Sequence, residues 1–230
     1  MRERYIEKLS QLHDELLNMG LLCEQAIMKT YRMLISRELR FEQVEEINRM
    51  EKEIDAKEHS VEAICIQLLL RQQPVATDLR RISAALKMVT DMERIGDQAT
   101  DIAEILETGS IDVPVKGINI AEMAEFTMGM VNKSVESFVN RDLDLAREVI
   151  DSDDILDKMF VNVRRALNED GSGFSSDQIL DLLMIAKYYE RIGDHATNIG
   201  EWVEFSLLGK HRNGEEAYFD IFAQQISGEG

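Results

Sequence analysis

The stretch DMERIGDQATDI at residues 91–102 recurs as YYERIGDHATNI at residues 188–199. Both copies contain Glu-Arg-Ile-Gly-Asp, followed one residue later by Ala-Thr and two residues after that by Ile. The leading glutamates, Glu93 and Glu190, are 97 residues apart in a chain of 230. A match of this length at nearly half the chain indicates an internal duplication of one structural unit.

Each copy of the duplicated unit also carries a second, upstream acidic pair. In every pair an acid is followed four residues later by Asp, and on a helix residues four apart lie on the same face. The upstream pairs recur at a spacing of 102 residues. The four pairs are Glu51/Asp55, Glu93/Asp97, Asp153/Asp157 and Glu190/Asp194.

The leading acid of each pair falls within the apolar stripe of its segment. Apolar or small residues flank Glu93 at alternating spacings of four and three, the pattern of a helix buried along one face. The members of this stripe are Ile82, Leu86, Val89, Gly96, Thr100 and Ala103. The other three pairs sit in the same register. We therefore expect each leading acid to face the core, with its partner Asp on the shoulder of the helix.

Acids in such positions are costly unless something compensates their charge. A buried, unpaired carboxylate costs several kcal/mol or shifts its pKa. Two carboxylates about 6 Å apart repel by roughly 3 kcal/mol at an effective dielectric of about 20. Arg94 and Arg191 are each rotated by one residue from the acids. A solvated acidic face is the alternative, but the register favours a multivalent cation with oxygen ligands, such as Mg²⁺, Ca²⁺, Mn²⁺, iron or Zn²⁺.

Composition restricts the class of protein. Only two Pro, together with abundant Leu, Ile, Met, Glu and Ala, favour an all-helical chain. The formal net charge of −18 argues against nucleic acid as a partner, because phosphate binding needs a basic surface. We see neither an N-terminal signal nor a membrane span in the sequence. Cys23 and Cys65 lie in apolar helical patterns and are expected to be buried, reduced thiols of a cytoplasmic protein.

The periodicity predicts six long helices that repeat in two groups of three. They are expected at residues 4–36, 42–72, 77–107, 119–139, 143–167 and 177–208. Pro74 ends the second helix, and Ser175 with Gln178 forms a capping box before the sixth.

The Gly- and Pro-containing linker at residues 109–118 divides the chain. The fold we predict is all-α, with two tandem and similar three-helix bundles at residues 1–108 and 119–208. We expect the bundles to have separate cores. The tail at residues 209–230 is expected to dock as a short segment or to fray.

The duplicated acid pairs, the ERIGDHATNI string and the three-helix layout resemble the PhoU family of phosphate-uptake and phosphate-signalling regulators. The resemblance covers Tyr5 to about Leu208. It implies two three-helix bundles whose E(D)xxxD motifs bind divalent or ferric metal ions, possibly as multinuclear clusters of Fe, Zn, Mn or Mg. By position, the implied ligands are Glu51, Asp55, Glu93, Asp97, Asp153, Asp157, Glu190 and Asp194, with Asp101 a further candidate.

The resemblance also implies a function and partners. The expected protein is a non-enzymatic negative regulator, a cytoplasmic homodimer peripheral to the inner face of the membrane. Its expected partners are a phosphate ABC transporter ATPase and a sensor histidine kinase. Alternatives are an accessory protein of another phosphate transporter and a metal-free helical adaptor. A ferritin-like di-metal enzyme is disfavoured, because Gly96 and Gly193 stand where its Glu-x-x-His motif requires His.

Two histidines lie near the acid pairs. His59 follows Asp55 by four residues and could join the first site, although its counterpart in the second half is Val161. His195 is turned by about 100° from Asp194 on a helix. We expect His195 on the surface or between the bundles.

Overall fold

The computed structural model consists of six long α-helices, and its described residues contain no β-strand. It describes residues 2–36, 40–72, 76–109, 111–112, 115, 117–169 and 173–209. The helices are α1 (Arg2–Ile35), α2 (Arg40–Gln72), α3 (Ala76–Thr108), α4 (Ile120–Asn140), α5 (Leu143–Leu167) and α6 (Ser176–Leu208). All six predicted helices are present, with bounds within two residues of the prediction. The predicted docking or frayed tail from residue 210 onward lies outside the described residues.

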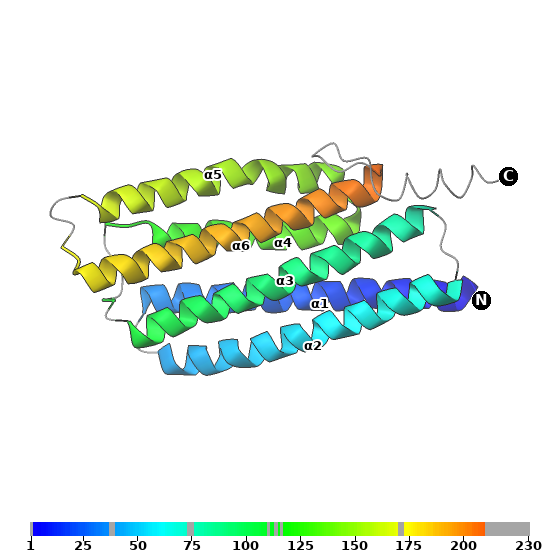
Figure 1. Cartoon of the computed structure of the whole chain (residues 1–230), viewed down its shortest axis with the longest axis horizontal. Coiled ribbons are helices and arrows are strands. Elements are labelled where there is room, and N and C mark those ends of the chain that lie inside the picture. The colour runs from blue at the N-terminus through cyan, green and yellow to red at the C-terminus, as the bar shows by residue number, and fades with distance from the viewer. Residues whose placement is uncertain are drawn as a thin grey trace.

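The helices form two groups of three that lie side by side along the long axis of the molecule (Figure 1). Helices α1–α3 contact one another, as do α4–α6, which confirms the two three-helix bundles. The two groups meet through α3 against α6 and α1 against α4. Gly209, at the end of α6, lies beside Arg80 near the start of α3, so these two central helices run antiparallel.

The expectation of separate cores is wrong. The buried apolar side chains form one continuous cluster that includes residues from both halves. Helices α3 and α6 lie between their own bundle and the other one, so many more of their residues are buried than residues of the outer helix α5. Burial on more than one side of α3 and α6 joins the two cores.

Equivalent helix contacts show the duplication in three dimensions. A Cβ atom on Gly96 would lie 3.0 Å from Cδ1 of Ile54, and one on Gly193 would lie 2.1 Å from Cδ2 of Leu156. These pairs are related by the same two spacings as the acid pairs. Glycine thus allows the close approach of α2 to α3 and of α5 to α6 directly beside the acids.

A second pair of contacts repeats between the halves, with residues of the third helices 97 apart and residues of the first helices 104 apart. The Cys23 thiol donates to the Met92 carbonyl over 3.3 Å, and the Thr127 hydroxyl donates to the Tyr189 carbonyl over 3.4 Å. Met92 and Tyr189 directly precede Glu93 and Glu190. The first helix of each half is therefore fixed to the third at the position where the acidic motif begins.

Local sequence signals define several helix ends. The Ser175 hydroxyl accepts from the Gln178 amide and the Gln178 side chain accepts from the Ser175 amide, which confirms the predicted capping box. Asp142 caps α5 by accepting from the Leu145 amide at 3.0 Å. Gly209 ends α6 in the left-handed region at φ 75°, which glycine adopts without a steric penalty.

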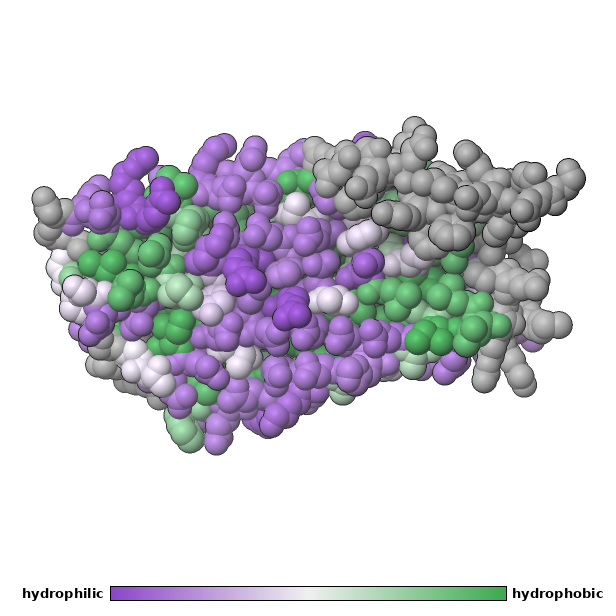
Figure 2. All heavy atoms as spheres, in the orientation of Figure 1, coloured by the Kyte–Doolittle hydropathy of each residue, from purple (hydrophilic) through white to green (hydrophobic). Residues whose placement is uncertain are grey.

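Polar side chains cover the middle of the face shown in Figure 2, and apolar patches lie toward its two ends. The exposed apolar residues of the molecule include Ile66 and Leu70 near the end of α2 and Leu180 and Met184 near the start of α6. Among the described helices, none has an apolar stretch long enough to cross a bilayer.

Candidate metal centre

The eight paired acids lie near the midpoints of α2, α3, α5 and α6. Because α2 packs on α3 and α5 packs on α6, the pairs come together two by two. We call Glu51, Asp55, Glu93 and Asp97 the first cluster, and Asp153, Asp157, Glu190 and Asp194 the second cluster.

Burial follows the predicted register on α3 and α6. The Glu93 side chain is 19% exposed, whereas Asp97 is 39% exposed. The Glu190 side chain is 12% exposed, whereas Asp194 is an exposed residue. The leading acids therefore face inward and their partners lie on the shoulder of each helix.

The carboxylates of the first cluster make each other's ionisation unfavourable. Desolvation by burial raises the pKa of Glu51, and repulsion from Asp55 and then Asp97 adds to the effect. Desolvation also raises the pKa of Glu93, with Asp97 as the next cause. Electrostatic coupling across the α2–α3 contact shows that the structure brings these two pairs together.

Burial and mutual repulsion also raise the pKa values of carboxyl groups in the second cluster. Desolvation raises the pKa of Asp153, against a hydrogen bond of 3.2 Å donated by the Thr197 hydroxyl. Asp194 keeps one side in solvent, but its carboxyl lies within the cluster. Desolvation, followed by repulsion from Glu190 and Asp153, raises its pKa to about 6.

One oxygen in the first cluster lacks any hydrogen-bond partner. Oε2 of Glu93 is buried, and it forms an ion pair with the Arg94 Nε at 3.5 Å without a hydrogen bond. A buried carboxylate oxygen without a donor costs free energy that a cation would recover. The donor set, all carboxylate oxygens, suits hard or borderline ions. The chemistry of the residues present therefore suits a metal.

The clusters are not closed into a finished coordination site. Among the described residues, no three His, Cys, Asp or Glu side chains are grouped closely enough to hold an ion in the positions shown. Whether the nine predicted ligands bind metal stays a prediction.

Asp101, the ninth predicted ligand, lies near residues of α6 as well as near the first cluster. It lies near Asp97, but it also lies near the Tyr188 hydroxyl on α6, and it raises the pKa of that hydroxyl. Its repeat equivalent Asn198 makes the matching contact, donating to Asp91 over 3.1 Å. Asp101 therefore belongs to the α3–α6 contact as well as to the edge of the first cluster.

His195 lies between the bundles, one of the two places predicted for it. Its Nδ1 is 2.8 Å from the Asp91 carboxylate, and its Nε2 is 3.1 Å from the amide of Gln98, its own repeat equivalent. His59, by contrast, is 78% exposed, with Nδ1 4.0 Å from Glu62. The structure does not bring His59 into the first cluster as an inward-facing ligand.

Sequence reasoning missed two pairs of residues beside the clusters. Glu58 on α2 lies near both Glu93 and Thr90 of α3. Lys187 on α6 forms an ion pair with Glu190 and lies 5.5 Å from the centroid of the Phe160 ring. Comparison of the two repeats at these positions would have revealed both pairs.

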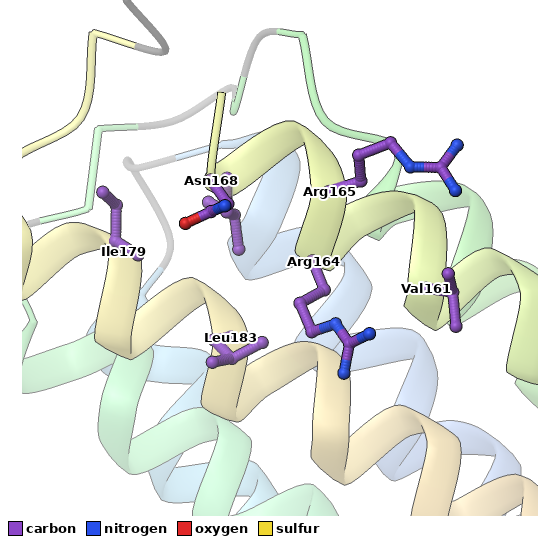
Figure 3. Close-up of a pocket in the computed structure, with 7 residues that line it drawn as sticks. Val161, Arg164, Arg165, Asn168, Ile179 and Leu183 are labelled. Atoms are coloured by element: carbon purple, nitrogen blue, oxygen red, sulfur yellow. The ribbon is translucent and has the colours of Figure 1, made fainter. Parts of the chain in front are cut away.

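One pocket, drawn in Figure 3, is lined by no acid of either cluster. It has a volume of about 560 Å³ between the end of α5 and the start of α6. Ile179 and Leu183 project into it from α6, and Arg164 reaches toward α6 from α5. A smaller hollow of about 470 Å³ includes Asp157 and Phe160 in its lining.

Known proteins share both the sequence and the fold. The sequence model of the PhoU domain matches residues 16–106 and again residues 120–203. A phosphate-specific transport system accessory protein PhoU homolog of Clostridium acetobutylicum is 34% identical over 91% of this chain and 96% of its own length. The corresponding homolog of Aquifex aeolicus is also 34% identical, over 82% of this chain and 86% of its own.

Solved structures agree with these sequence matches. The crystal structure of PhoU from Pseudomonas aeruginosa matches with a TM-score of 0.80 and 28% identity, covering 90% of this chain and 100% of that one. PhoU from Streptococcus pneumoniae has the same TM-score at 20% identity, which supports the fold alone.

Asp194→Asn is expected to stabilise chelator-treated protein in a pH-dependent way. The folded-state pKa of about 6 lies above the ordinary 3.8, so stability is fully present below the lower value and is lost as pH rises through the higher one. The variant should raise the free energy of unfolding near pH 7.5 by about 1 kcal/mol, a value reduced for the solvent-exposed side of the carboxyl. The gain should be smaller near pH 5.

Urea unfolding at both pH values measures this difference. Asp14→Asn, at an exposed position on α1, is the control for loss of one negative charge. If Asp194→Asn raises the free energy of unfolding equally at the two pH values, or not at all, the raised pKa assigned to Asp194 is wrong.

Proposed function

The chain belongs to the PhoU family, and from this we propose that it is a metal-binding, non-enzymatic regulator of phosphate uptake. The curated relatives carry the name of accessory proteins of a phosphate-specific transport system. The corresponding role for this chain is that of an accessory protein to phosphate transport.

The observation that supports metal binding is the set of desolvated carboxylates that repel one another in both halves. The first cluster adds the buried Glu93 oxygen without a hydrogen-bond partner. Divalent or ferric ions, singly or as a multinuclear cluster, would supply positive charge there and link α2 to α3 and α5 to α6. To share an ion, the acids of a cluster would have to lie closer together than they do in this structure.

The proposed partners are the transporter ATPase and a sensor histidine kinase at the inner face of the membrane. A regulator of this kind acts through protein surfaces, and the molecule exposes apolar side chains toward both of its ends (Figure 2). Its net charge of −18 opposes direct action on DNA. We include a homodimer in the proposal. An accessory role to another phosphate transporter, or a metal-free adaptor, remains the alternative.

Metal should bind to the purified protein and stabilise it. Chelator-treated protein titrated with Mn²⁺, Zn²⁺ or Fe should gain about 2.7 kcal/mol at an ion concentration one hundred times Kd, because the ion binds only the folded state. The double variant Glu93→Gln/Asp97→Asn should lose the first site and keep the second. Elemental analysis and thermal unfolding measure both effects.

Glu7→Gln/Asp14→Asn is the matched control, since it removes two exposed negative charges of α1 outside the clusters. It should bind as much metal as the parent. Failure of every ion to bind or to stabilise the parent would refute metal binding. Loss of both sites in the Glu93/Asp97 variant would refute two separate sites.

Loss of the gene should leave phosphate uptake excessive, or phosphate-starvation genes active, when phosphate is plentiful. We expect this result because deletion would remove a protein that restrains uptake. Pull-down from membrane extracts should recover a transporter ATPase or a sensor kinase, and promoter DNA should not bind.

Complementation with Glu190→Gln/Asp194→Asn separates a structural metal from a signalling one. Restraint at normal protein level would make the metal structural, whereas failure of a folded variant would make it part of the signal. Normal phosphate control after clean deletion, with no second copy of the gene, would contradict the regulatory role.

A further inference from the structure

The two clusters can be compared position by position because the duplication relates their surroundings. The Gly96–Ile54 and Gly193–Leu156 contacts occupy equivalent places, so the residues beside each leading acid can be matched. Arg94 and Arg191 follow the leading acids in both halves. Arg94 lies 3.5 Å from Glu93 through its Nε and 3.4 Å from Asp97 through its Nη1, and its side chain is 57% exposed, so solvent weakens these pairs.

The first difference lies on α2 and α5. Glu58 lies close enough to Glu93 to repel it, so the first cluster has a fifth carboxylate. The equivalent residue on α5 is Phe160, which packs against the core and has no oxygen to offer. The first cluster therefore has one more possible oxygen ligand than the second.

The second difference lies on α3 and α6, the helices that pack against α2 and α5. Thr90 on α3 lies near Glu58 and favours its charged form, whereas its equivalent on α6 is Lys187. The Lys187 ammonium pairs with Glu190 and lies 5.5 Å from the centroid of Phe160. Phe160 and Lys187 thus replace Glu58 and Thr90 as a matched pair.

The two leading acids therefore differ in the contacts that an incoming ion has to break. An ion that binds Glu190 has to displace an ammonium group, which breaks a charge-assisted contact and a cation–π contact. An ion that binds Glu93 meets a buried oxygen without a hydrogen bond, whose ion pair with the Arg94 Nε is longer, at 3.5 Å. Lys52 and Asp154 also differ in charge at equivalent positions, but both are exposed, where solvent weakens their influence.

We propose that Lys187 is a built-in competing cation, so that the first cluster binds metal more tightly than the second. This inference rests on the metal binding proposed above. Glu58 adds to the preference by supplying a further carboxylate to the first cluster. The second cluster would then fill only at higher metal concentration, which gives the molecule a singly and a doubly loaded state.

Calorimetric titration of chelator-treated protein with Mn²⁺ tests the proposal one cluster at a time. Glu190→Gln/Asp194→Asn leaves only the first cluster intact, and Glu93→Gln/Asp97→Asn leaves only the second. The first should bind with a Kd about tenfold lower. Adding Lys187→Thr, which introduces the residue of the first half, should tighten the second cluster about five- to tenfold.

Lys133→Thr is the matched control, because it removes a lysine that pairs with Glu148 outside the clusters. It should leave both affinities unchanged. The reciprocal variant Glu58→Phe/Thr90→Lys should weaken the first cluster about tenfold, and it gives an independent test if Lys187→Thr does not fold.

Equal affinities of the two clusters, or equal effects of Lys187→Thr and Lys133→Thr, would overturn this proposal while leaving metal binding intact. Absence of Mn²⁺ binding to either single-cluster protein and to the parent would overturn the proposed function and this inference together.

Discussion

The antiparallel contact of α3 with α6 is the constraint on which the rest of the structure depends. Each helix carries one copy of the duplicated stretch, and each copy presents two faces. One face holds the residues of the contact between halves, where His195 meets Gln98 and Asp91. The other face turns Glu93 or Glu190 toward the neighbouring helix of its own bundle. The acids and the glycine are identical in the two copies, whereas positions in the contact between the halves differ, as Gln98 against His195 and Asp91 against Tyr188.

The duplicated stretch places carboxylates at positions where apolar side chains would make the protein more stable. Glu93 occupies a position in the apolar stripe, and a glycine three residues later allows Ile54 to approach closely. Leu or Met at this position would bury apolar area without desolvating a charge. A sequence that keeps an acid there, in both halves, departs from the most stable choice at a place where binding accounts for the departure.

Much of this could be predicted from the sequence, because the signals are local. Six uninterrupted helical patterns, two Pro and one Gly/Pro linker fix the helices, and the register of Glu93 and Glu190 gives their inward orientation. The joined core could not be predicted, since periodicity shows that α3 has an apolar face but not which helices cover its sides. The roles of Glu58 and Lys187 depend on side-chain conformations across a helix contact. Their difference between the repeats was nevertheless visible in the sequence, as Glu against Phe and Thr against Lys.

The central claim is that opposed carboxylates on neighbouring helices hold metal. Anomalous X-ray scattering from crystals grown with Mn²⁺ locates the ions directly. The account predicts ordered ions between α2 and α3 at Glu93 and Asp97, with the carboxylates drawn inward, and further ions between α5 and α6 at higher Mn²⁺ concentration. Ordered Mn²⁺ confined to other surfaces, with both clusters unchanged and free of scattering, would contradict it.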